Sequence, residues 1–192
     1  MNYEDDTLHR VVITGLGTVS PCGHDVPTSW NNIVSGRSGV APITLFPTDD
    51  LNVKIAAEVK EWDPMRYMEA KDARRRDQCV RFAVVAAREG ARQAGLTIDE
   101  WHAFDIGVFV GTAVGGLNSY YDVCSAHILH GARRVGTLAI PLMVGESASS
   151  HVALELGARG PNMARPQSIR TVMTNSCGFG GHHTVLILKR LE

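Results

Sequence analysis

Close pairs of cysteines, long apolar runs and an excess of one charge are all missing from this sequence. Its four cysteines, at positions 22, 79, 124 and 177, lie far apart and form no Cys-x-x-Cys pair. A structural zinc site needs close pairs of ligands, and a disulfide scaffold needs many cysteines in a short chain. We therefore expect no metal site, and free thiols in a reducing compartment for at least three of the four cysteines.

No segment approaches the roughly 20 apolar residues that a membrane-spanning helix requires. The first residues include Glu4, Asp5 and Asp6, and they are not followed by the apolar stretch of a secretory signal. The formal net charge is −1, so the whole chain has no general attraction for nucleic acid. The sequence predicts a cytoplasmic protein that binds neither membranes nor nucleic acid.

What is present is the composition of an ordinary globular domain. Hydrophobic residues make up 44% and charged residues 20% of the 192 residues, which argues against intrinsic disorder. A chain of this length can bury about 70% of the surface that its unfolded form exposes. One domain core is therefore expected.

Hydrophobic patterns alternate between strand-like and helical segments. Short β-branched runs predict strands, and apolar residues at three- and four-residue steps predict helices. The expected strands are residues 10–15, 53–59, 105–111, 170–175 and 184–189. The expected helices are residues 27–34, 74–94, 117–130 and 141–156. Strands that alternate with helices indicate an α/β fold with a largely parallel sheet.

Two glycine-rich stretches adjoin predicted strands. Residues 15–21 predict a tight loop, and Ser20 stands where a dinucleotide-binding turn would have its third glycine. No cofactor is therefore expected. Residues 176–181, with the sequence Ser-Cys-Gly-Phe-Gly-Gly, connect the last two strands. They predict a hairpin whose backbone closely approaches another group.

Cys177 lies among these glycines, close to His182 and His183. One alternative is therefore a small thiol hydrolase, with Cys177 as nucleophile and His183 as base. This chemistry needs an imidazole within hydrogen-bond reach of the sulfur. Sequence spacing alone does not supply that contact, and an inert cysteine is the commoner situation.

A basic cluster, Lys-Asp-Ala-Arg-Arg-Arg-Asp, occupies residues 71–77. It can be a solvated face that Asp72 and Asp77 partly neutralise. It can also be a docking surface for an acidic partner, because arginine binds phosphate and carboxylate groups well. The cluster coincides with the predicted start of a helix, where cations are electrostatically disfavoured, and this position favours docking.

Six segments, taken in order along the chain, resemble one known family. The first runs Arg-Val-Val-Ile-Thr-Gly-Leu-Gly, and the last is Asn-Ser-Cys-Gly-Phe-Gly-Gly-His. The segments are residues 10–17, 35–40, 73–77, 110–117, 157–162 and 175–182. Together they resemble β-ketoacyl-acyl-carrier-protein synthase II, a condensing enzyme of the thiolase-like superfamily.

The resemblance implies a thiolase-like α/β fold. An incomplete N-terminal synthase domain would occupy residues 1–162, and residues 163–192 would be a remnant of the C-terminal domain. Such enzymes elongate an acyl thioester by decarboxylative condensation with malonyl-acyl carrier protein, in fatty acid or polyketide biosynthesis. A cysteine holds the acyl group, and two histidines assist the decarboxylation.

The resemblance also implies roles for five residues of this chain. Val114 matches a position that lines the acyl pocket. Phe179 matches the residue that gates this pocket and offers its backbone N–H to the oxyanion. Lys71, Arg74 and Arg75 match the surface that binds acyl carrier protein, which is acidic and carries the phosphopantetheine-linked substrate.

The chain departs from the family after residues 157–162. Family members are about twice as long, and there they continue into a strand, an Ala-Cys-Ala nucleophile turn and two histidine motifs. Here residues 163–169 lead directly to the final hairpin. We therefore expect a chain that is inactive alone and exposes apolar surface. It would form a homodimer, or would dimerise with a full-length synthase as a non-catalytic partner subunit.

Overall fold

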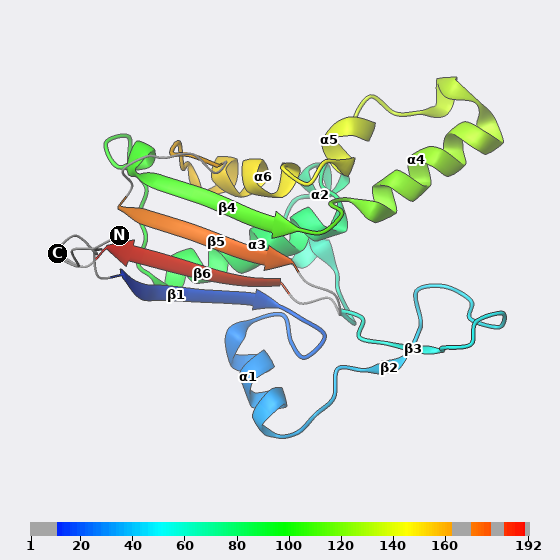
Figure 1. The fold of residues 1–192 in the computed structure, drawn as a ribbon, viewed down its shortest axis with the longest axis horizontal. Coiled ribbons are helices and arrows are strands. Elements are labelled where there is room, and N and C mark those ends of the chain that lie inside the picture. Colours follow the sequence, from blue (N-terminus) through cyan, green and yellow to red (C-terminus); the bar gives the residue numbers. More distant parts are fainter. Residues whose placement is uncertain (1–10, 163–169, 178–182, 191–192) are drawn as a thin grey trace, which may run out of the picture.

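The computed structural model describes residues 11–162, 170–177 and 183–190, which fold around a four-stranded sheet (Figure 1). Its strands lie in the order β1-β6-β5-β4, and a separate two-stranded sheet pairs β2 with β3. In chain order the strands are β1 (Val11–Val19), β2 (Ala41–Pro42), β3 (Ile55–Ala56), β4 (Ile106–Thr112), β5 (Thr171–Cys177) and β6 (His183–Arg190).

Helices connect these strands. The α-helices are α1 (Val26–Val34), α2 (Ala70–Arg74), α3 (Gln78–Gln93), α4 (Leu117–His130), α5 (Ala139–Met143) and α6 (Ser147–Leu156). The 3₁₀-helices are η1 (Pro64–Arg66), η2 (Ala103–Asp105) and η3 (Ala132–Arg134). Within the described residues, no helix combines the length and apolar content needed to span a bilayer.

The sheet is mixed, so the predicted largely parallel sheet is wrong. β4 and β5 run parallel, whereas β6 runs antiparallel to both β5 and β1. Only residues 178–182 separate β5 from β6. A connection this short joins antiparallel strands, because a parallel crossover needs about a dozen residues or more. The α/β class itself is confirmed.

The core lies between the sheet and α3, which covers one face of it, with α6 beside α3 (Figure 1). Met173, Val185 and Ile187 alternate along β5 and β6 and have no exposed surface. They pack in one cluster with Ala83 and Val84 of α3. The residues between them on these strands are half-buried or exposed. This alternation shows that the sheet has one buried face and one more open face.

The tight loop expected at residues 15–21 is wrong, because β1 continues through both glycines. A Cβ atom on Gly17 would lie 1.9 Å from the carbonyl oxygen of Ala86, and one on Gly15 would lie 2.2 Å from that of Gly90. Both carbonyl groups belong to α3. These glycines therefore allow the helix backbone to lie directly on the strand.

The helix predicted over residues 74–94 begins four residues later, as α3 at Gln78, and the separate short helix α2 ends at Arg74. Asp77 precedes α3, and its Oδ1 accepts a hydrogen bond of 3.0 Å from the backbone N–H of Cys79. An aspartate in this position satisfies one of the unpaired N–H groups of the first turn. Gly95 follows the last turn with a φ of 60°, and this agrees with the helix end predicted there.

The strand expected at residues 53–59 is much shorter. Only Ile55–Ala56 forms a ladder, opposite Ala41–Pro42. A proline has no backbone N–H with which to continue the ladder.

The helix predicted over residues 141–156 is divided into α5 and α6. The carbonyl oxygen of Met143 accepts a hydrogen bond of 3.1 Å from the N–H of Gly116. A residue outside the helix thus replaces the bond that would have continued it. The other expected elements are confirmed: the helices at 27–34 and 117–130, and the strands at 10–15, 105–111, 170–175 and 184–189.

Glu155 on α6 joins two arginines from the α3 side of the core. Its Oε2 accepts a hydrogen bond of 3.0 Å from Arg76 Nη2, and its Oε1 accepts one of 2.8 Å from Arg88 Nε. Burial alone would raise the pKa of Glu155, but the bonds and charges of Arg88 and Arg76 outweigh it and lower that pKa. Arg76 is therefore a buried structural residue rather than part of a solvated face.

Replacing Gly17 with alanine is expected to destabilise the fold by about 1–3 kcal/mol, the usual cost of overpacking a core. The added Cβ would meet backbone atoms of α3, which cannot rotate away as a flexible side chain would. Chemical denaturation of the full chain measures this effect. Gly136→Ala is the matched control, because a Cβ there meets no atom within 4 Å. Equal unfolding free energies for the two variants would contradict the close-packing argument.

Candidate functional site

A cavity of about 600 Å³ lies at the carboxyl end of β4, next to the loop that leads into α4. Ligand sites of α/β proteins commonly occur at this end of the strands. The walls combine apolar side chains with hydroxyl, amide and carboxylate groups. The lining residues are 109–114, Gly145, Glu146, Ser149 and Asn162.

Two glycines shape the loop after β4. Gly115 has a φ of 80°, a conformation that other residues rarely adopt. A Cβ atom on Gly116 would lie 2.0 Å from the carbonyl oxygen of Leu142 in α5. The loop therefore packs directly on the α5 backbone. Val114, which the sequence predicts to line the acyl pocket, is exposed and lines this cavity.

Asp77 connects this loop to α3. Its Oδ2 accepts hydrogen bonds of 2.6 Å from Ser119 Oγ and 3.2 Å from Ser119 N, in the first turn of α4. Its other oxygen caps α3. A single buried carboxylate thus satisfies N–H groups of two helices. The expectation that Asp77 partly neutralises a solvated basic face is wrong.

The sequence patterns did not predict the polar groups that line this cavity. Ser149 is buried, and its Oγ donates a hydrogen bond of 3.0 Å to the carbonyl oxygen of Glu146. Thr112 Oγ1 accepts a bond of 3.1 Å from the N–H of Gly115. Asn162 ends one of the six family-like segments, which is the signal that could have found it. Ser149 lies in a run of small residues, and only the packing of α6 brings it to the cavity.

The sheet register brings Cys177 beside residues of two other strands. Cys177 is the partner of Thr112 in the parallel ladder and of His183 in the antiparallel ladder. His183 is buried, and its ring centroid lies 5.0 Å from that of Phe82 in an edge-on arrangement. The backbone therefore makes Cys177 and His183 cross-strand neighbours. Phe179 lies outside the described residues.

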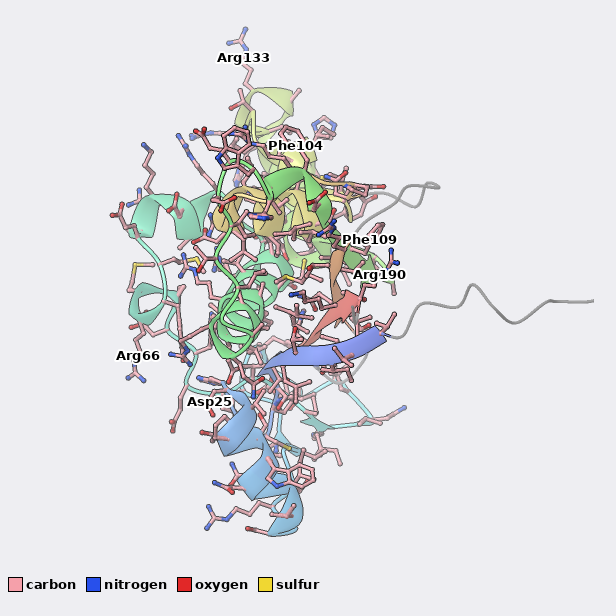
Figure 2. All side chains as sticks on the ribbon, turned by 90° about the vertical axis from the view of Figure 1, so that its left-hand side faces the viewer. Asp25, Arg66, Phe104, Phe109, Arg133 and Arg190 are labelled. Carbon is pink, nitrogen blue, oxygen red and sulfur yellow. The ribbon has the colours of Figure 1, made fainter. Side chains whose placement is uncertain are left out.

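Lys71, Arg74 and Arg75 are exposed and form a basic surface on α2 and the residue after it. Lys71 and Arg74 lie in the last turn of α2, where the helix dipole favours cations. Arg74 and Arg75 also come just before Asp77, the N-cap of α3, so their predicted position near the start of a helix holds for α3. Arg66 of the neighbouring η1 is also exposed and points away from the body of the molecule in Figure 2.

The basic surface and the cavity lie at the same end of α3. Arg75 is followed closely by Asp77, which bonds to the first turn of α4. The cavity-lining loop leads directly into that turn. The structure thus brings the predicted basic residues and Val114 to neighbouring elements.

Known proteins match both the sequence and the fold. Residues 8–166 match the family described as Beta-ketoacyl synthase, N-terminal domain. The chain is 38% identical over 169 residues to 3-oxoacyl-[acyl-carrier-protein] synthase 2 of Staphylococcus aureus (strain COL), covering 88% of this chain and 41% of that protein. It is also 38% identical over 153 residues to the Synechocystis sp. protein of the same name, covering 80% of this chain and 37% of that protein.

Solved structures share the fold at low sequence identity. The ishigamide ketosynthase/chain length factor matches with a TM-score of 0.82 and 19% identity, over 95% of this chain and 59% of that chain. A beta-ketoacyl synthase from Burkholderia phymatum matches with a TM-score of 0.77 and 15% identity, over 96% of this chain and 60% of that chain.

The fold is therefore that of the ketosynthases, and the predicted thiolase-like α/β class is confirmed. The chain belongs to the β-ketoacyl synthase family, as its motifs predict. It spans 41% of the length of the Staphylococcus aureus protein.

Replacing Asp77 with alanine is expected to loosen the first turns of α3 and α4, because both lose an acceptor for their N–H groups. The loss of a helix cap costs about 0.5–2 kcal/mol. Hydrogen exchange at the Ser119 amide should accelerate, since that N–H is bonded to Asp77. Asp72→Ala, in the neighbouring α2, is the control. Unchanged protection of Ser119 would show that Asp77 does not anchor α4.

Proposed function

We propose that this chain is a β-ketoacyl synthase family protein that cannot catalyse the condensation on its own. The stretch of chain after residues 157–162 carries this proposal. Among the described residues the next strand is β5, and it ends in Cys177 of the glycine-rich signature. The family's nucleophile turn and both histidine motifs are missing from the intervening sequence. Losing a nucleophile typically costs several powers of ten in rate.

The parent reaction explains why this loss is decisive. An elongating synthase holds the acyl group as a cysteine thioester while histidines assist the decarboxylation of the malonyl unit. Phe179 would remain as a contributor to the oxyanion hole. Val114 would remain beside the acyl chain, in the cavity at the end of β4. These residues can bind and orient a substrate, but they cannot form the thioester.

Binding of acyl carrier protein is the part of the function that this chain is expected to retain. Lys71, Arg74 and Arg75 are exposed together, and cations of this kind attract an acidic protein that carries a phosphate-linked arm. One solved neighbour, described as a type II PKS acyl-carrier protein in complex with its ketosynthase, is such an assembly. A cytoplasmic location is the expected setting for this partnership.

A partner subunit is a second interpretation, supported by the exposure of α4. None of its residues is buried, and Tyr121, Ile128 and Leu129 are all more than two thirds exposed. Large apolar side chains in this situation indicate a surface that another chain covers. A homodimer or a heterodimer with a full-length synthase would cover these side chains. Co-purification with the full-length synthase would favour the heterodimer.

A thiol enzyme is the third interpretation, and the strand register supports it. Cys177 and His183 are cross-strand partners, and such residues have Cβ atoms roughly 5 Å apart. A thiol nucleophile needs an imidazole within hydrogen-bond reach, and this pairing makes the two residues backbone neighbours. Under this interpretation Cys177 would accept an acyl group from a thioester.

An acyl-transfer assay distinguishes the inactive chain from the thiol enzyme. Incubation of the full chain with radiolabelled acyl-acyl carrier protein is expected to leave no label on the protein, because the family's nucleophile turn is missing. The Staphylococcus aureus relative serves as the positive control. Label that persists on the chain, disappears in Cys177→Ser and remains in Cys124→Ser would refute inactivity and support the thiol enzyme.

Carrier-protein docking is tested by reversing the charge of the basic surface. The triple variant Lys71→Glu, Arg74→Glu, Arg75→Glu should bind acyl carrier protein about tenfold more weakly or worse, a loss of at least about 1.4 kcal/mol. Fluorescence anisotropy of labelled carrier protein measures this affinity. Arg133→Glu, Arg134→Glu reverses an exposed pair on η3 and should have little effect. Equal weakening by both variants would mean that the attraction is non-specific.

A further inference from the structure

A narrow arm extends from the body of the molecule between α1 and η1. It consists of β2, β3 and the loop that joins them, and Figure 1 shows it projecting away from the four-stranded sheet. This loop, residues 44–53, contains two adjacent carboxylates, Asp49 and Asp50, and no lysine or arginine. Both are exposed, and within the described residues neither takes part in an ion pair. We call residues 44–53 the acidic loop.

Large apolar side chains accompany these carboxylates. Leu45, Phe46 and Val53 belong to the acidic loop, and each is more than half exposed. Apolar side chains gathered on a projecting element indicate a surface that another molecule covers. The carboxylates beside them favour a partner surface that carries positive charge.

The base of the arm is held by a buried carboxylate, that of Glu58. Its Oε2 accepts a hydrogen bond of 2.8 Å from Thr44 Oγ1, and its Oε1 accepts one of 3.1 Å from Thr44 N. The N–H of Ile43 donates a bond of 3.0 Å to the carbonyl oxygen of Lys54 on the opposite side of the arm. The acidic loop therefore starts from a fixed base, which lowers the entropic cost of binding through it.

A second extension, formed by the end of α4 and by η3, carries the opposite charge. Residues 123–145 include Arg133 and Arg134 but no aspartate or glutamate. Both arginines are exposed, and Figure 2 shows Arg133 pointing away from the body of the molecule. In the part of the chain that the structure describes, neither has an ion-pair partner. Ile128 and Leu129 are exposed beside them. We call residues 127–134 the basic tip.

The acidic loop and the basic tip project from the same side of the body and lie apart in Figure 1. Within one chain, therefore, they do not cover one another. A two-fold axis between their outer ends would bring the acidic loop of one copy to the basic tip of a second copy. The same contact would form again with the roles of the copies exchanged, as in any two-fold dimer. Opposite charges and apolar side chains would meet at both contacts.

We propose that this chain forms a homodimer in which the acidic loop of each copy packs on the basic tip of the other. Asp49 and Asp50 pair with the two arginines of the partner's tip, and Phe46 packs among its apolar side chains. The proposal rests on the interpretation of the chain as a subunit and names the surfaces that it would use. Its failure would leave carrier-protein binding and the lack of condensing activity untouched.

Analytical ultracentrifugation of the full chain measures the dissociation constant of the dimer. The variant Asp49→Lys, Asp50→Lys should raise this constant about tenfold or more, a loss of at least about 1.4 kcal/mol, because loop and tip then carry like charges. Arg133→Glu, Arg134→Glu should raise it for the same reason. Glu69→Lys, Glu100→Lys is the matched control for the loop variant. It makes the same change in net charge at exposed carboxylates outside both surfaces and should leave the constant unchanged.

An equimolar mixture of the two charge-reversed variants tests the pairing itself. Each variant alone places like charges at both contacts, whereas in the mixed dimer both contacts again join opposite charges. The mixture should therefore associate about as tightly as the unaltered chain.

The unaltered chain gives a measurement that does not depend on whether a variant folds. Its association should weaken as the salt concentration rises, because exposed charges are screened. A chain that stays monomeric at every concentration, or an association that salt does not weaken, would overturn the proposal. So would a mixture of the folded variants that associates no better than its components.

Discussion

The fold depends on how closely α3 lies on β1. Carbonyl oxygens of Ala86 and Gly90 occupy the space in which Cβ atoms of Gly17 and Gly15 would stand, so the two backbones are in direct contact. The same contact brings α3 down onto β6, where Val185 is completely buried. The remaining core packs around this crossing, because a close-packed interior leaves the helix little freedom to lie elsewhere.

The position of α3 in turn determines what lies at each of its ends. At the amino end, Asp77 caps the helix and anchors α4, and this holds the loop that carries Val114. At the carboxyl end, Gly95 ends the helix beside a second cavity, which Lys189 lines. Glu155 holds α6 against the same helix through two arginines. The two cavities therefore lie near opposite ends of α3.

The family and the chemistry of this chain rest on different observations. The family match covers residues 8–166, whereas the aligned region is 41% of the Staphylococcus aureus protein. The scaffold that positions a pocket and a basic surface is present, but a scaffold supports many functions and chemistry depends on the site. Ile128 and Leu129 on α4 are exposed, and large apolar side chains in this situation indicate a surface that another chain can cover.

The sequence by itself determined the α/β class, the family, the helix at residues 117–130 and the final hairpin, because hydrophobic periodicity and ordered motifs are local properties. The tertiary structure alone decided the antiparallel pairing of β6 with β1, the two cavities and the roles of Arg76 and Asp77. Arg76 bonds to a residue 79 positions away, and Asp77 to one 42 positions away. Whether a charged side chain is buried or exposed depends on such distant partners, which no local pattern records.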